Sequence, residues 1–189
     1  SPEILVSPAE ANRNIKIFDQ YQYDKPEAAA DADKSKALWD PAFSVDFMNG
    51  KTGNTSYAMM VPVGARAKQW ANTSKATEAV IGNRGPQIKS LKKGGAPNVT
   101  ATLENPASNT LLIHGGRKTW EGNIAYNDNH VNFETQMSPE DSKYRDAKGI
   151  RWNDCLFADE IDDASGTNNY LGISTTAGKE MKDFTLIWD

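Results

Sequence analysis

The residues with the clearest potential for chemistry are acidic and lie in the segment 158–169, ADEIDDASGTNN. Calcium takes about six to eight oxygen ligands in a flexible geometry, and this segment is rich in carboxylate, hydroxyl and amide oxygens. The spacing is not that of an EF-hand loop, because the acids do not alternate and Gly166 is out of place. A solvated acidic loop without an ion is the alternative. The calcium ligands that we predict are Asp159, Asp162, Asp163 and Asn168.

The two histidines of the chain, His114 and His130, are the next candidates. Zinc normally takes three or four protein ligands, so a two-histidine site would also need carboxylates such as Asp128 or Glu134. The simpler interpretation is that His114 hydrogen-bonds the backbone of a glycine loop and His130 lies on a polar face. No G-x-S-x-G elbow or similar setting for a nucleophile accompanies them, so we do not expect an enzyme.

Three tryptophans, Trp70, Trp120 and Trp152, are candidates for stacking on the apolar face of a sugar. Trp120 follows a pair of glycines and is the best placed of the three for a loop platform. A role in the core or in a subunit contact is the simpler interpretation for each of them, and the sugar platform is the alternative.

The clearest structural pattern is a β-hairpin that would carry several of these side chains. Residues 123–127 and 130–134 flank Asp128-Asn129, a dipeptide that tolerates the positive φ of a two-residue type I′ turn. With Asn127 opposite His130, one face of the hairpin is apolar and the other is polar, as a half-buried sheet requires. The pairs predicted on the apolar face are Tyr126 with Val131 and Ile124 with Phe133.

The rest of the chain fits an antiparallel sheet with long loops. We predict further strands at 55–63, 98–104, 109–113 and 184–188, and short helices over 73–80 and from Ser138 to about Gly149. The sequence therefore predicts one globular domain, residues 1–189, of a β-rich α+β class. Its expected features are an antiparallel sheet with a C-terminal hairpin, few short helices and long loops.

Composition excludes several classes of function. The 189 residues carry a formal net charge of -4, so the chain lacks the basic surface that binding to nucleic acid requires. A single cysteine, Cys155, excludes an internal disulfide framework and a four-cysteine zinc site. No apolar run approaches the roughly 18 residues that a membrane-spanning helix needs.

Four blocks of the sequence together resemble a known family. They are SYAMMVP (56–62), GNRGP (82–86), NTLLIHGG (109–116) and NIAYNDNHVNFE (123–134). The combination resembles the C-terminal globular domain of bacterial pseudopilin-like proteins, in the branch named for a His-x9-Asp-Gly motif. The residues that fall on the motif are His114, Gly115, Gly116, Asn123, Asp128, His130 and Val131, and Asn129 stands where the family has glycine.

The chain also departs from that pattern. The spacing from His114 to Asp128 is longer than the family name states, because residues are inserted around 117–121. Asn129 accepts a positive φ less readily than glycine but still allows the turn. The long N-terminal hydrophobic helix of the family is absent from the sequence given.

The resemblance implies a structural, non-enzymatic role. The chain would be the head of an exported protein, periplasmic or at the cell surface, anchored in the inner membrane by that N-terminal helix. It would assemble with other pilin-like subunits, or with itself, into a filament or a type II secretion pseudopilus. Some major pseudopilins carry calcium in a C-terminal loop, which agrees with the calcium prediction. The alternative function is an extracytoplasmic carbohydrate- or surface-binding β-module that uses Trp120.

Overall fold

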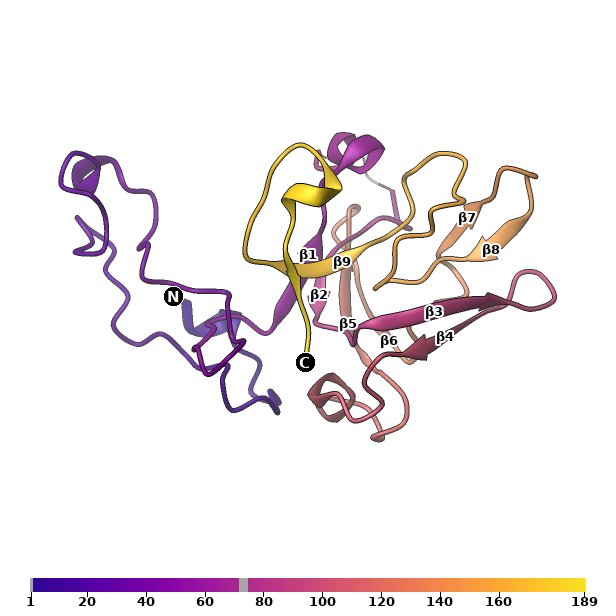
Figure 1. Ribbon diagram of the computed structural model, residues 1–189, viewed down its shortest axis with the longest axis horizontal. Coiled ribbons are helices and arrows are strands. Elements are labelled where there is room, and N and C mark those ends of the chain that lie inside the picture. Colours follow the sequence, from indigo (N-terminus) through magenta and orange to yellow (C-terminus); the bar gives the residue numbers. More distant parts are fainter. Residues whose placement is uncertain (1, 72–74) are drawn as a thin grey trace. The chain divides into compact units, whose positions relative to one another are not determined.

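The computed structural model describes residues 2–71 and 75–189, which gather into two compact units (Figure 1). The first unit ends at Ser56 and the second spans Tyr57–Asp189. The single domain expected from the sequence stays a prediction.

The first unit is built from turns rather than from strands. Its regular elements are two 3₁₀ helices, η1 (Pro2–Leu5) and η2 (Lys34–Lys36), and one parallel bridge between Ile15 and Gly53. Asp40 is a central anchor, since its carboxylate accepts hydrogen bonds from the backbone N–H groups of Gln22 and Ala42. Hydrogen bonds of this kind replace sheet ladders in a segment whose sequence lacks an apolar stripe.

The second unit is an antiparallel β structure with three sheets (Figure 1). The largest has six strands in the order β10-β9-β1-β2-β5-β6, and two ribbons, β3-β4 and β7-β8, accompany it. The strands are β1 (Tyr57–Met60), β2 (Ala79–Asn83), β3 (Ile88–Lys93), β4 (Val99–Leu103), β5 (Gly122–Tyr126), β6 (Val131–Glu134), β7 (Lys143–Arg145), β8 (Arg151–Asn153), β9 (Leu171–Ser174) and β10 (Leu186–Ile187). The 3₁₀ helices are η3 (Gly64–Lys68), η4 (Asn109–Leu112) and η5 (Met181–Asp183).

One face of the six-stranded sheet carries the core. Ile124 is fully buried and Tyr126 is 4% exposed, and both lie on this face of β5. Gly82 on the neighbouring strand allows the approach, because a Cβ added there would lie 2.3 Å from the Ile124 side chain. Trp120 and Phe157 pack edge to face at 4.7 Å between ring centroids and extend the core beyond the sheet.

The β-rich fold class expected from the sequence is confirmed. All the strand pairs within the named sheets are antiparallel, and the helical segments among the described residues are 3₁₀ turns of at most five residues. None of the described helices is long and apolar enough to cross a membrane.

The β5-β6 hairpin forms, but its predicted turn and register are wrong by one residue. Asn123 pairs with Phe133, and Tyr126 and His130 close a three-residue loop in which Asn129 alone has a positive φ of 71°. Asp128 favours this loop because its Oδ1 accepts a hydrogen bond from the backbone N–H of His130 at 3.2 Å.

The shift in register turns every side chain of β6 to the opposite face. Val131 and Phe133, which were expected to face the core beside Tyr126 and Ile124, are instead 62% and 50% exposed. The predicted apolar pairs therefore do not form, and β6 presents its apolar side chains to solvent at the edge of the sheet.

Other local predictions were also wrong. Residues 109–112 form η4 rather than a strand, because the Ser108 hydroxyl caps the backbone N–H of Thr110. The helix expected from Ser138 is replaced by β7 and β8, which are joined by a turn that the Asp146 carboxylate organises through the N–H groups of Lys148 and Ile150. The predicted helix over 73–80 partly falls outside the described residues, and its end belongs to β2.

The three-residue loop predicts that glycine at position 128 and glycine at position 129 have opposite effects on the free energy of unfolding. Asn129→Gly relieves a left-handed backbone and should be neutral or raise the free energy of unfolding by up to about 1 kcal/mol. Asp128→Gly should destabilise, since it removes the contacts to His130. Chemical denaturation of both variants measures this. Asn132→Ala, at an exposed extended position, is the control, and a stabilising Asp128→Gly would contradict the loop.

Candidate functional site

The acidic segment is held by a buried arginine from η3. Arg66 is 4% exposed, and its guanidinium contacts both oxygens of Asp159 at 2.8 and 3.2 Å. The same group donates to Asn168 Oδ1 at 3.1 Å and to the carbonyl of Val61 at 3.3 Å. A planar guanidinium with five donors suits this bidentate contact. Two of the four predicted calcium ligands are thus already bound to one cation of the chain.

The next acidic residue of the segment, Asp162, is bound by a lysine from β3. Lys93 pairs with Asp162, and its ammonium lies over the rings of Trp152 and Tyr144, 4.7 and 5.1 Å from their centroids. Asp162 also accepts a hydrogen bond from the Tyr144 hydroxyl at 3.1 Å. The lysine therefore ties the acidic segment to both the β3-β4 and β7-β8 ribbons, with cation–π attraction added to the ion pair.

The remaining predicted ligand, Asp163, organises its own loop. Its carboxylate accepts hydrogen bonds from the backbone N–H groups of Ser165, Thr167 and Asn168 at 3.0, 2.7 and 2.8 Å. In the described part of the chain, no three His, Cys, Asp or Glu side chains come together as a metal-binding group. Calcium at this segment stays a prediction, and an ion would have to displace Arg66 from Asp159 and Lys93 from Asp162.

Glu160 of the segment is buried together with a second carboxyl group, Asp154, that sequence reasoning missed. Burial raises the pKa of Asp154 to about 8 and that of Glu160 to about 10, and the charge of Asp154 raises the pKa of Glu160 further. Glu160 accepts from the backbone N–H of Cys155 and from the Asn168 amide, both at 2.7 Å. Asp154 Oδ2 accepts from Asn169, and its Oδ1 has no donor. The pair therefore retains a proton at neutral pH.

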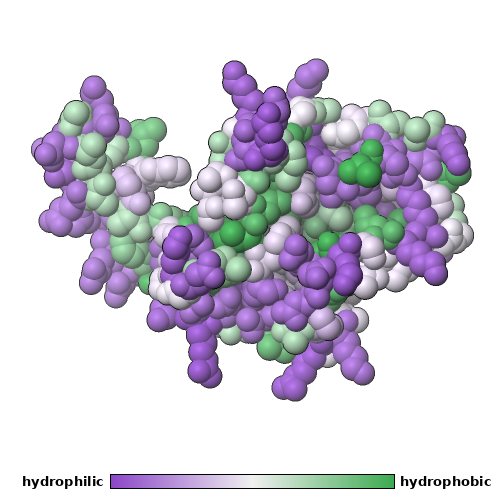
Figure 2. Space-filling view, in the orientation of Figure 1, coloured by the Kyte–Doolittle hydropathy of each residue, from purple (hydrophilic) through white to green (hydrophobic). Residues whose placement is uncertain are grey.

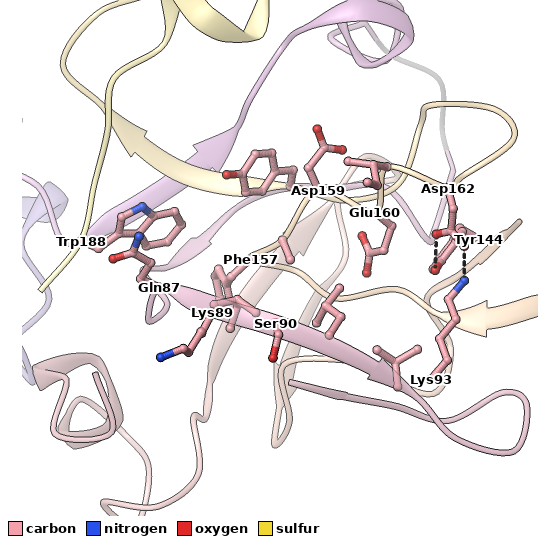
Figure 3. Close-up of a pocket in the computed structure, with 16 residues that line it drawn as sticks. Gln87, Lys89, Ser90, Lys93, Tyr144, Phe157, Asp159, Glu160, Asp162 and Trp188 are labelled. Carbon is pink, nitrogen blue, oxygen red and sulfur yellow. Dashed lines mark hydrogen bonds and ion pairs between the residues drawn. The ribbon is translucent and has the colours of Figure 1, made fainter. Parts of the chain in front are cut away.

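A groove of about 540 Å³ runs between β3 and the acidic segment (Figure 3). Trp188 and Gln87 lie at one end of it, and Lys93 with Asp162 and Tyr144 lies at the other. The volume is in the range of about 300–1,000 Å³ that is typical of ligand pockets. Figure 2 shows apolar surface set among hydrophilic side chains in the part of the view where β3 and β9 lie.

The residues of the family motif have structural contacts at the hairpin and the loop before it. The ring of His130 stacks on Tyr126 with 4.6 Å between centroids, and its Nδ1 contacts Asp128. His114 is exposed and meets Phe133 edge to face at 5.8 Å. Because Tyr126 and Phe133 lie on opposite faces of the hairpin, the two histidines also contact opposite faces.

Of the two glycines of the motif, Gly115 is required for close packing of the loop. A Cβ on Gly115 would lie 2.0 Å from the carbonyl oxygen of Thr119, so only glycine fits there. Gly116 has more room, with its nearest neighbour at 4.0 Å. On β5, the backbone N–H of Asn123 donates to the side chain of Asn83 at 2.8 Å, which fixes its strand to β2.

Trp120 does not form a sugar platform, and the core role that the sequence favoured for it is observed. Trp120 is 1% exposed, and its indole N–H donates to the carbonyl of Arg84 at 3.0 Å. Trp152 is also buried, whereas Trp70 is 51% exposed. A buried indole cannot stack on a ligand, so Trp120 is a core residue.

A comparison of this chain with known protein families, with curated proteins and with solved structures finds no match. The geometry described above therefore carries the functional argument.

The contacts of the buried Arg66 guanidinium predict that replacing this residue lowers the free energy of unfolding substantially. Arg66→Met keeps the apolar stem but leaves the Asp159 carboxylate and Asn168 without their donor, so the free energy of unfolding should fall by roughly 2–4 kcal/mol. Lys182→Ala is the matched control, because its pair with Glu180 is exposed and should contribute less than about 1 kcal/mol. If urea denaturation shows equally small losses in the free energy of unfolding for Arg66→Met and Lys182→Ala, the proposed anchoring by Arg66 is contradicted.

The raised pKa of Asp154 predicts that the stability of the fold decreases as the pH rises. The folded pKa of Asp154 is raised from 3.8, so its stabilising contribution is complete below that value and is lost as the pH rises through about 8. Asp154→Asn removes this group and should flatten the fall in melting temperature between about pH 4 and pH 8. Asp141→Asn, an exposed change nearby, is the control. Parallel pH profiles of wild type and Asp154→Asn would contradict the assignment.

Proposed function

We propose that this chain is a non-enzymatic assembly subunit, the head of a pseudopilin-like protein that associates with further copies of itself. The observation that carries the proposal is the exposed apolar edge strand β6. Val131 and Phe133 are 62% and 50% exposed there, at one end of the six-stranded sheet.

The apolar surface continues across the sheet from this edge. The strand registers place Met59, Ile81, Ala125 and Val131 in one row over β1, β2, β5 and β6. Met59 is 46% exposed, so the row reaches solvent at both ends. A contiguous apolar patch with a free strand edge is typical of a surface that contacts another protein.

The edge also lacks the usual protection against pairing. Natural edge strands often carry lysine, proline or a bulge, whereas β6 has the sequence VNFE and pairs regularly with β5. Its one charged residue, Glu134, is engaged by the Tyr126 hydroxyl at 2.8 Å. A second copy can therefore add a strand at β6, and its own apolar side chains would pack beside Val131 and Phe133 on the extended sheet.

The geometry of the motif residues fits this role. His114 lies against Phe133 at the same edge, and Asp128 with His130 fixes the turn that sets the register of β6. In this proposal the motif shapes a contact surface rather than a reaction centre. The proposal includes export and an inner-membrane anchor supplied by the N-terminal helix that the resemblance implies, and other pilin-like subunits as partners.

Sedimentation velocity over a range of protein concentrations tests the proposal. We expect the average mass of the wild type to rise with concentration, and Val131→Lys combined with Phe133→Lys to weaken association by about tenfold or more. Both positions are at least half exposed, so the variant should fold, which circular dichroism checks. Leu38→Lys, at a fully exposed leucine outside the sheet, is the control.

Two results would reject the proposal. One is a wild type that remains monomeric at every concentration. The other is a double variant that associates as strongly as the wild type, since the contact would then lie elsewhere. If contact joins β6 of one copy to β6 of another, assembly stops at a dimer, whereas contact between unlike surfaces continues to larger species.

A further inference from the structure

The groove between β3 and the acidic segment is a binding site in its own right, separate from the β6 edge. We propose that it binds a neutral carbohydrate chain. The charge of the groove, its aromatic and polar lining, and the fixed position of its walls all suit such a ligand.

Most of the charges that line the groove are balanced within the chain, and Lys89 of β3 is an exposed lining cation that makes no ion pair among the described residues. Asp159 is paired with Arg66, Asp162 is paired with Lys93, and burial raises the pKa of Glu160 to about 10, so it stays protonated at neutral pH. A cationic ligand would have to compete with these internal partners. An anionic ligand would meet three carboxyl groups along one wall. The balance therefore favours a ligand without net charge.

The lining offers the two kinds of contact that a sugar ring uses. Trp188 and Tyr170 are partly exposed aromatic rings in the groove and can stack on the apolar face of a pyranose. Gln87 and Ser90 on the β3 side are exposed and carry amide and hydroxyl groups. Within the described residues, the side chains of Trp188, Gln87 and Ser90 make no hydrogen bond, so these groups are available to sugar hydroxyls.

The walls of the groove are fixed before any ligand binds. Trp188 follows β10, which pairs with β9, and the next residue, Asp189, is paired with the buried Arg84. The opposite end is closed by Lys93, which joins β3 to Asp162 (Figure 3). A preorganised site loses less conformational entropy on binding, which suits a ligand held by a few weak contacts.

The test uses saturation-transfer NMR and isothermal titration calorimetry with cellohexaose, maltohexaose and chitohexaose at millimolar concentration. We expect at least one of these hexasaccharides to bind. Trp188→Ala should weaken that binding by about tenfold or more, whereas Trp188→Phe keeps a ring and should retain part of the affinity. Trp39→Ala removes a more exposed tryptophan outside the groove and should leave binding unchanged.

Three outcomes would overturn the proposal. The first is no binding of any of the three hexasaccharides to a protein whose circular dichroism shows it to be folded. The second is binding that Trp188→Ala leaves at full strength, or that Trp39→Ala weakens equally. The third is binding of spermidine or of a sulfated glycan at this groove in place of the neutral chains, because the balance of charge would then be wrong.

Discussion

The buried guanidinium of Arg66 is the interaction on which much of the second unit depends. It reaches from the 3₁₀ helix after β1 to Asp159 and Asn168, far along the sequence, and it lies over the ring of Tyr170 at 5.5 Å from the centroid. A buried cation is tolerated only when its donors are satisfied, so the acidic segment must adopt one arrangement around it. In this arrangement the acidic segment forms one wall of the groove and leads into β9.

The acidic segment illustrates how a cluster of carboxylates can be satisfied from within a chain. Asp162 is matched by Lys93, Asp163 by the backbone N–H groups of its own loop, and Glu160 by protonation, because burial raises its pKa to about 10. Each solution uses a different physical means, namely an ion pair, hydrogen bonds to the charged form, or loss of the charge. Together they turn a sequence rich in negative charge into a nearly neutral surface.

The sequence predicted the strands of the hairpin well, because alternation and a turn dipeptide are local signals. It missed the register because a single side-chain contact, Asp128 to the His130 N–H, selects a three-residue loop. It missed the partners of the acidic segment for a different reason. Arg66 and Asp159 are separated by 93 positions, and a long-range ion pair leaves no local pattern. The burial of Trp120 depends likewise on the carbonyl of Arg84, which only the fold brings near.

Cys155 gains a particular property from its place under the acidic segment. Its thiol is fully buried, and burial raises its pKa to about 12, so almost no thiolate exists at neutral pH. Its backbone N–H is held by Glu160. Alkylating reagents can therefore modify the native protein only during transient opening of this region. Because the chain has a single cysteine, the rate at which its thiol is alkylated reports the rate of that opening without any added label.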